Sequence, residues 1–303
     1  MSPRSPLISV ADLADELQDP NLVVVDARWY LGKPGAGRAA YLEGHIPGAI
    51  HLDLDTDLAE LGNPKAFGAP GRHPLPDPRM WAAAMAARGI GNDSRVVAYD
   101  DVGGWVAARM WWMLDDLGFE AVSVLDGGIG AWTSASLPVS SGEEPVRAPR
   151  RLELADSWTG VIERDDLRSK LGSVVLLDAR AAPRYRGEIE PVDPIAGHIP
   201  TAVNTPIADN LGPDGRLLAP EALRSRFEAL GAGGPSEVVT SCGSGTSATH
   251  HSLAMRIAGL PDPILYVGSY SDWSRSGYPI ATGAEPGGPP DPGAPPEPGG
   301  DSR

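Results

Sequence analysis

The 303-residue chain is long enough for two domains of about 150 residues each, and its apolar fraction of 42% and charged fraction of 21% are those of a globular protein. A formal net charge of −15 repels phosphate backbones and argues against nucleic acid as a partner. No apolar run approaches the roughly 20 residues that span a bilayer, which argues against a membrane partner. Without a signal-like N-terminus and with a single cysteine, the protein is expected to be cytoplasmic.

Four segments of the first half of the chain recur in the same order in the second half. They are an apolar run that ends in Asp-Ala-Arg, a Gly-His-Ile-Pro segment, a second apolar run and a stretch that ends in Trp. The pairs are 22–28 with 174–180, 44–49 with 197–202, 96–100 with 238–242 and 122–132 with 264–273. A repeat of this kind predicts two domains of one fold.

Short apolar runs alternate with helix-like stretches rich in Ala, Leu, Met and Arg. These stretches are 78–88, 106–117, 220–230 and 247–258. The alternation predicts the α/β class, with two tandem domains that each hold a parallel sheet flanked by helices. Pro and Gly content predicts the boundaries, which are a first domain at 1–137, a linker at 138–157, a second domain at 158–282 and a disordered Pro/Gly-rich tail at 283–303.

The two Gly-His-Ile-Pro segments contribute one histidine to each domain, His45 and His198. We interpret these histidines as loop-to-backbone hydrogen-bond anchors of the fold. Because no other Cys/His cluster accompanies them, the sequence predicts neither a metal site nor a cofactor.

Cys242, the only cysteine, follows the apolar run 238–241 and precedes the loop Gly-Ser-Gly-Thr-Ser and a helical stretch. A strand, a Gly-rich loop and a helix N-terminus bring backbone N–H groups together, and such a nest suits a reactive thiolate. The alternative interpretation is a small buried apolar side chain. In the first half the matching position is Asp100, so only the second half carries a nucleophile.

These segments resemble the two-domain rhodanese-like sulfurtransferases over roughly residues 7–281. The most specific matches are the Asp-Ala-Arg strand ends, both Gly-His-Ile-Pro segments, the Cys-Gly-Ser-Gly loop and the Gly-Ser-Tyr-Ser-Asp-Trp segment at 268–273. The resemblance implies two tandem rhodanese-like domains, an inactive N-terminal one and a catalytic C-terminal one, with sulfur carried as a persulfide on Cys242.

The loop after the cysteine separates the two main classes of this family. Thiosulfate enzymes tend to carry basic residues there, whereas 3-mercaptopyruvate enzymes carry Cys-Gly-Ser-Gly, as this chain does. The implied function is transfer of a sulfane sulfur from 3-mercaptopyruvate to a thiol, thioredoxin-like or cyanide acceptor. Thiosulfate as the donor and a non-catalytic sensing or binding module remain alternatives, and the preferred donor, the physiological acceptor and the oligomeric state stay open.

The resemblance also implies a proton relay for the leaving enolate. Ser244 matches the loop serine of the family, His73 its histidine, and Asp55 its acid. An imidazole that is oriented by a carboxylate and hydrogen-bonded to a hydroxyl can act as a general acid or base. Asp53 or Asp57 could take the place of Asp55.

Arg184 matches the substrate-binding arginine of the family and can hold a carboxylate bidentately. Arg186 is a second candidate, although both arginines could instead form a solvated basic surface. Asp193 stands where mercaptopyruvate enzymes usually have a further arginine. The other predicted substrate-binding residues lie in the cysteine loop, and they are Gly243, Gly245, Thr246 and Ser247.

A cysteine in a nest of N–H groups is also found in protein phosphatases, which form a competing function class. Those enzymes need an arginine six or seven positions after the cysteine to hold phosphate. Ala248 and Thr249 occupy these positions here, so the phosphatase interpretation is poor.

Overall fold

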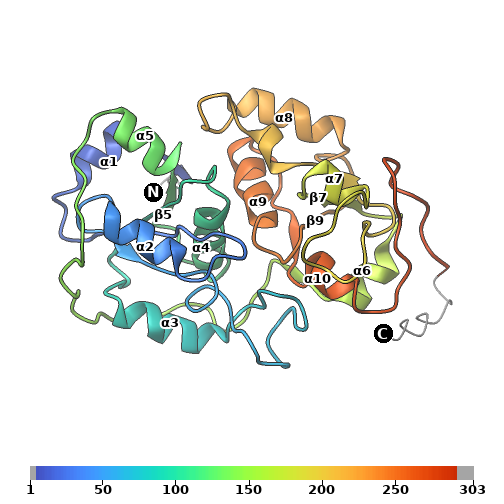
Figure 1. Cartoon of the computed structure of the whole chain (residues 1–303), viewed down its shortest axis with the longest axis horizontal. Helices are drawn as coiled ribbons and strands as arrows, with labels where there is room; N and C mark the ends of the chain where they lie inside the picture. The colour runs from blue at the N-terminus through green and yellow to red at the C-terminus, as the bar shows by residue number, and fades with distance from the viewer. Residues whose placement is uncertain (1–4, 292–303) are drawn as a thin grey trace. The chain divides into compact units, whose positions relative to one another are not determined.

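The computed structural model describes residues 5–291 and divides into two compact units (Figure 1). The first unit contains the described residues up to Glu60 together with Pro76–Thr159 and Leu211–Leu217. The second contains Leu61–Leu75, Gly160–Asn210 and the described residues from Leu218 onward. The predicted boundaries therefore miss two short segments, 61–75 and 211–217, which the chain order assigned to the other domain.

The first unit is a five-stranded sheet of parallel strands in the order β1-β5-β4-β2-β3. Its strands are β1 (Leu7–Ile8), β2 (Leu22–Asp26), β3 (Ile50–His51), β4 (Arg95–Tyr99) and β5 (Val122–Leu125). Its helices are α1 (Val10–Glu16), α2 (Ala36–Glu43), α3 (Pro78–Ala87), α4 (Trp105–Asp116) and α5 (Gly128–Ser134).

The second unit repeats this plan, with a parallel sheet in the order β6-β10-β9-β7-β8. Its strands are β6 (Val161–Ile162), β7 (Val175–Asp178), β8 (Val203–Asn204), β9 (Val238–Ser241) and β10 (Ile264–Tyr266). Its helices are α6 (Arg164–Lys170), α7 (Ala182–Tyr185), the 3-10 turn η1 (Ile207–Asn210), α8 (Pro220–Ala229), α9 (Ala248–Ile257) and α10 (Ser269–Trp273). The α/β class and the internal repeat are confirmed.

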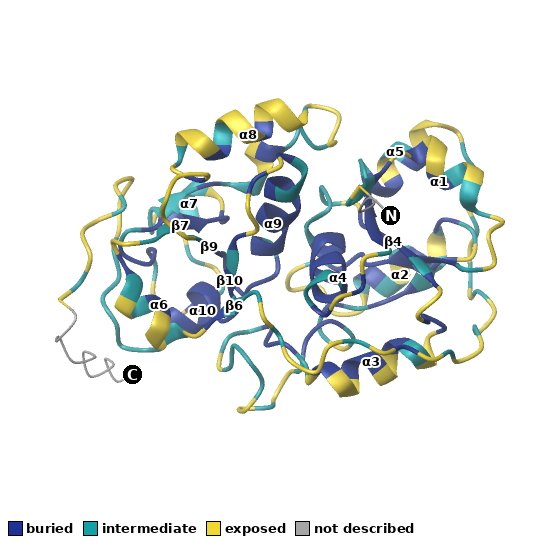
Figure 2. Cartoon of the chain, turned by 180° about the vertical axis from the view of Figure 1, so that it is seen from behind, coloured by how far each residue is buried: buried dark blue, intermediate teal, exposed yellow. Residues whose placement is uncertain are grey.

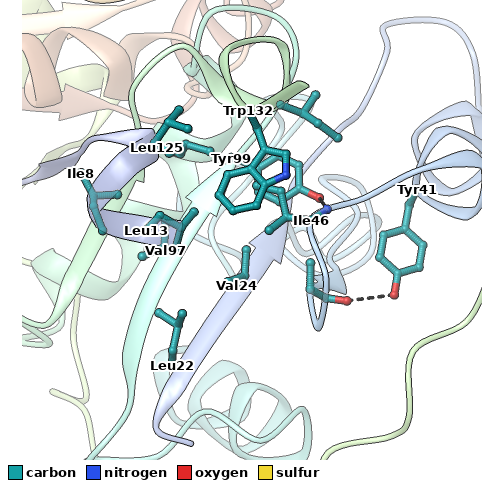
Figure 3. Close-up of a cluster of buried hydrophobic side chains, with 13 residues drawn as sticks. Ile8, Leu13, Leu22, Val24, Tyr41, Ile46, Val97, Tyr99, Leu125 and Trp132 are labelled. Atoms are coloured by element: carbon teal, nitrogen blue, oxygen red, sulfur yellow. Dashed lines mark hydrogen bonds between the residues drawn. The ribbon is translucent and has the colours of Figure 1, made fainter. Parts of the chain in front are cut away.

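Burial explains why the strands appear in the sequence as continuous apolar runs. Every residue of β2 is buried, as expected for a parallel sheet covered on both faces. In the first unit, Leu13, Tyr41 and Trp132, from α1, α2 and α5, join the cluster that contains Val24 and Val97 of the sheet (Figure 3). The helices that follow the central strands, α4 and α9, are mostly buried, whereas α3 and α8 expose one face (Figure 2).

The two histidines of the Gly-His-Ile-Pro segments act as predicted. His45 Nδ1 lies 2.8 Å from the carbonyl oxygen of Tyr41, and His198 Nδ1 lies 2.8 Å from that of Tyr185. Each imidazole stacks on the ring of the same tyrosine, with centroids 4.0 and 3.7 Å apart. The same anchor thus joins a helix end to the next strand in both units.

The segment predicted as a linker follows the surface of the first unit. Ser140 pairs with His45, Arg147 donates to the carbonyl oxygen of Leu22 at 2.6 Å, and the backbone N–H of Ala155 donates to Leu117. Residues 138–157 therefore lie along the surface of this unit and are hydrogen-bonded to it.

The predicted disordered tail begins at residue 283, but the structure holds its first residues by hydrogen bonds. The backbone N–H of Thr201 donates to Pro286 at 2.6 Å, and that of Gly283 donates to Arg186 at 3.0 Å. The predicted boundary therefore lies too early, and residues 292–303 lie outside the described part of the chain. Among the described residues, no helix combines the length and apolar character needed to cross a membrane.

Candidate active site

The cysteine loop connects β9 to α9 and curls around a buried sulfur atom. Cys242 is 1% exposed, and the backbone N–H groups of Ser244 and Gly245 donate to its Sγ at 3.4 and 3.1 Å. Gly245 has φ +77°, and a Cβ there would lie 2.3 Å from the carbonyl oxygen of Val267. Only glycine allows this close turn, and the resulting amide nest stabilises negative charge on sulfur.

Residues 269–271, at the start of α10, form hydrogen bonds to the cysteine loop. Ser269 Oγ accepts the backbone N–H of Cys242 at 3.0 Å, and the backbone N–H of Tyr270 donates to the Cys242 carbonyl at 3.0 Å. The N–H of Ser271 donates to Gly243 at 2.9 Å. The sequence marked residues 268–273 only as a family signature, and nothing in the spacing indicated that Ser269 would contact the nucleophile.

His73 and Ser244 are brought together in the second unit. His73 Nδ1 lies 2.7 Å from Ser244 Oγ, and both residues are buried. The position of His73 is fixed in part by its neighbour Arg72, whose backbone N–H donates to Ser271 Oγ at 3.0 Å. This pairing places a titratable imidazole on the hydroxyl two residues after the nucleophile, as the resemblance implied.

The three candidate acids lie in the first unit, where the carboxylate of each accepts a hydrogen bond. Asp57 pairs with Arg88 at 2.7 Å and accepts the backbone N–H of Asp53 at 2.8 Å. Asp53 Oδ1 in turn accepts the backbone N–H of Asp55 at 2.8 Å. Asp55 Oδ2 accepts the indole N–H of Trp29 at 2.9 Å, and the pairing of Asp55 with His73 stays a prediction.

An arginine cluster surrounds a buried carboxylate in the second unit. Asp193 has a fully buried side chain and pairs with Arg72, with Arg184 at 3.2 Å and with Arg275 at 3.3 Å. Arg184 also donates to Glu190 at 2.6 Å. Burial acts to raise the pKa of Glu190, but the hydrogen bonds from Arg184 and from the Asp193 backbone hold that pKa below its ordinary value.

Two of these guanidinium groups border the cysteine loop. A Cβ at Gly243 would lie 2.8 Å from Arg72 Nη2 and 3.5 Å from Arg184 Nη1. The sequence predicted Arg184 at this place and missed Arg72, although Arg72 directly precedes the predicted His73. Arg186 differs from expectation, because its guanidinium pairs with Glu188 at 2.7 Å on an exposed surface, and no contact with the cysteine loop is found among the described residues.

The remaining loop residues have less defined roles. Thr246 Oγ1 is buried and has no hydrogen-bond partner within residues 5–291. Ser247 precedes α9, and its side chain makes no capping hydrogen bond there. Gly243 and Gly245 shape the loop, whereas substrate contacts by Thr246 and Ser247 stay predictions.

In the first unit, the side chain of Asp100 occupies the equivalent nest of backbone N–H groups. Asp100 follows β4 as Cys242 follows β9, and it is fully buried. Its carboxylate accepts four backbone N–H groups at 2.8–3.1 Å, from Val102, Gly104, Val106 and Ala107. Burial raises the pKa of Asp100, and these hydrogen bonds oppose the shift. The loop of this fold thus surrounds a hydrogen-bond acceptor, which in this unit is a fixed carboxyl group and not a thiol.

Comparison with known proteins agrees with this geometry. The model of the rhodanese-like domain matches residues 9–135 and 163–276. The probable 3-mercaptopyruvate sulfurtransferase of Pseudomonas aeruginosa is 46% identical over 282 residues, which cover 91% of this chain and 98% of that protein. The putative thiosulfate sulfurtransferase SseB of Mycobacterium tuberculosis is 38% identical over 282 residues, covering 88% and 93%. The crystal structure of the 3-mercaptopyruvate sulfotransferase SseA from Escherichia coli superposes with a TM-score of 0.75 at 30% identity, covering 88% of this chain and 100% of that one.

Proposed function

This chain belongs to the rhodanese-like sulfurtransferases, and from that premise we propose that it moves a sulfane sulfur from 3-mercaptopyruvate to a thiol or cyanide through a persulfide on Cys242. The observation that carries the proposal is the amide nest around the only cysteine, with Gly245 N–H 3.1 Å from Sγ. A Ser244–His73 pair stands beside that sulfur.

In the first half-reaction the Cys242 thiolate attacks the sulfur of 3-mercaptopyruvate. A sulfur–sulfur bond forms while the carbon–sulfur bond of the donor breaks, and the bonding electron pair leaves on carbon as the enolate of pyruvate. The donor thiol proton balances the equation, because it leaves the sulfur and a proton reaches the enolate carbon. The products are the Cys242 persulfide and pyruvate.

The Ser244–His73 pair supports proton delivery to the leaving enolate. Ser244 Oγ is two residues from the nucleophile in the chain and 2.7 Å from His73 Nδ1, so the hydroxyl can pass on a proton that the imidazole replaces. Asp55 is proposed as the carboxylate that orients His73.

In the second half-reaction a thiol or cyanide attacks the outer sulfur of the persulfide and returns Cys242 to the thiolate. The backbone N–H groups of Ser244 and Gly245, which contact Sγ, are placed to stabilise that returning charge. Thioredoxin-like thiols are the proposed protein acceptors. The single cysteine has no partner for an internal disulfide, which fits the reducing cytoplasm proposed as its compartment.

The second candidate function is thiosulfate sulfurtransferase. Arg72 and Arg184 both border Gly243, so the surroundings of the cysteine loop are more basic than the loop sequence alone indicates. Thiosulfate is a dianion that benefits from cations near the nucleophile. In that reaction the leaving group is sulfite, which needs no proton on carbon.

A comparison of the two donors tests the proposal. Purified protein is supplied with 3-mercaptopyruvate or with thiosulfate and a common acceptor, and pyruvate and sulfite are measured to give kcat/KM for each donor. We expect a higher kcat/KM for 3-mercaptopyruvate and no product above background from Cys242→Ser. A wide preference for thiosulfate would favour the second candidate, and no product from either donor would support a binding module instead.

A further inference from the structure

We propose that Arg72 is a second donor-binding residue of this site, which holds the carboxylate of the donor together with Arg184, and that Asp193 is the positioning residue that aims both guanidinium groups. The inference rests on the proposed function, since it names the residues that recognise the anionic end of the substrate. It concerns residues of the second unit only.

One carboxylate anchors both arginines. Asp193 Oδ1 accepts from Arg72 Nη1, and Asp193 Oδ2 accepts from Arg184 Nη2 at 3.2 Å. The side chain of Asp193 is fully buried, so water does not compete for these bonds. Because each guanidinium is planar, fixing one nitrogen constrains where its other nitrogens lie.

The unanchored ends of the two guanidinium groups converge beside the nucleophile. Arg72 Nη2 and Arg184 Nη1 are the atoms closest to the Cβ position of Gly243, at 2.8 and 3.5 Å. Neither nitrogen has a hydrogen-bond partner within residues 5–291. Arg72 Nε is buried and also lacks a partner in this part of the chain. Two guanidinium nitrogens on the same side of the cysteine loop can together bind one carboxylate.

The charges of this cluster indicate which class of anion the two guanidinium groups can bind. Four arginines share three carboxylates, which leaves one net positive charge before Cys242 is counted; they are Arg72, Arg180, Arg184 and Arg275 with Asp178, Glu190 and Asp193. Burial lowers the pKa of Arg72 from its ordinary value, as do the charges of Arg184 and Arg275, while the charges of Asp193 and Cys242 oppose that shift. A guanidinium nevertheless stays protonated in proteins. One net charge with two converging donors matches a monoanionic carboxylate better than a dianion.

This arrangement gives a physical account of an acid at position 193. An aspartate there supplies no charge to the substrate, but it orients Arg72 from a different segment of the chain, 61–75, toward the loop. The competing interpretation is a salt-bridge cluster that only stabilises the unit. Such a cluster would affect unfolding and leave donor affinity unchanged.

The test compares Arg72→Gln and Arg72→Lys with Arg224→Gln as the matched control. Arg224 lies in the same unit, pairs with Glu228 at 3.0 Å and donates to the carbonyl oxygen of Gly259 at 2.9 Å, and it is not among the closest atoms to Gly243. For 3-mercaptopyruvate we expect Arg72→Gln to raise KM by about 30-fold with kcat changed less than about threefold, because carboxylate binding is lost from ground and transition states alike. Arg72→Lys should recover about a third of that loss at most, since it keeps the charge and loses the planar fork.

Pyruvate binding gives a second readout that does not depend on turnover. In the Cys242→Ser background, calorimetry should show pyruvate binding weakened by about tenfold or more in Arg72→Gln and within about twofold in Arg224→Gln. Equal effects of the two substitutions, or unchanged KM and pyruvate affinity in Arg72→Gln, would overturn the assignment of Arg72. Failure of the proposed function would be seen separately, as absence of a sulfur adduct on the wild-type cysteine with either donor.

Asp193→Asn tests the positioning residue by its effect on donor choice. Removal of one negative charge leaves two net positive charges beside the loop, so kcat/KM for thiosulfate relative to 3-mercaptopyruvate should rise about tenfold. The double variant Asp193→Asn with Arg275→Gln restores one net charge and should bring the ratio back toward wild type. A ratio that does not move in the single variant, with the protein folded, would contradict a charge-setting role for Asp193.

Discussion

At the residue scale, the backbone groups and the side chains near Cys242 make separate contacts. Backbone N–H groups of Ser244 and Gly245 face the sulfur, whereas the Ser244 hydroxyl is hydrogen-bonded to His73. The proposed relay is therefore separate from the anion nest, and each can be perturbed without the other.

Ser244→Ala tests the relay, because it keeps the backbone donor and removes the hydroxyl. We expect kcat with 3-mercaptopyruvate to fall about 100-fold, since the enolate then leaves without proton delivery. Thiosulfate turnover provides the internal control and should fall less than about fivefold, because sulfite needs no such proton. The measurement is steady-state kcat with both donors. An equal loss of kcat with the two donors would show that Ser244 only shapes the loop.

The residues near Cys242 differ in how far the sequence alone could identify them. Cys242, Ser244, His73 and Arg184 could be proposed as site residues from the sequence because each lies in a short motif that resembles a family pattern. Arg72 could not, since its partner Asp193 is 121 residues away in the chain and the contact is made only after folding. An arginine next to a predicted catalytic histidine was the one available signal.

At the element scale, the loop that joins a central strand to the following helix surrounds a different side chain in each unit. In the second unit it surrounds Cys242, and in the first it surrounds Asp100, whose carboxylate accepts four N–H groups at the start of α4. The strands and long helices were predictable because apolar runs and periodic stretches are local signals. Segment 61–75 was not, because its contacts with the second unit are long-range.

Asp100→Ala is expected to lower stability without lowering specific activity. The substitution leaves four buried N–H groups without their acceptor, which should reduce the free energy of unfolding by about 2–4 kcal/mol. Turnover per folded molecule should stay within about twofold of wild type, because no thiol is present in this unit. Urea unfolding and kcat measured below the transition check both parts.

The control for that experiment is Asp101→Ala at the next position, where the exposed carboxylate accepts, within residues 5–291, only from the Tyr30 hydroxyl. Its effect on unfolding should stay below about 1 kcal/mol. A large loss of specific activity in Asp100→Ala, with normal stability, would mean that the first unit takes part in the chemistry.

At the scale of the whole molecule, buried histidines tie stability to pH. Burial lowers the pKa of His251 to about 3, with the charges of His250 and Arg226 acting in the same direction. Burial also lowers the pKa of His198 and His51. Each group is neutral in the folded state and takes up a proton in the unfolded chain near its ordinary pKa of 6.5.

The sign follows from proton counting. Below about pH 6.5 the unfolded chain binds more protons than the folded protein, so the free energy of unfolding falls as pH falls, by up to about 1.4 kcal/mol per pH unit for each such histidine. Urea unfolding at pH 7.5, 6.5 and 5.5 should show this decline. His251→Gln should make it shallower, whereas a stability that is flat over this range would show that the histidines are not held neutral.

The central claim, sulfur carried on Cys242, is tested most directly by intact mass measured after one turnover with 3-mercaptopyruvate and no acceptor. The account predicts that the protein gains one sulfur atom, about 32 Da, in a one-to-one ratio with pyruvate released. The added mass should disappear when a thiol is supplied, and it should not form on Cys242→Ser. Release of pyruvate without a gain in mass, or the same adduct on Cys242→Ser, would contradict the account.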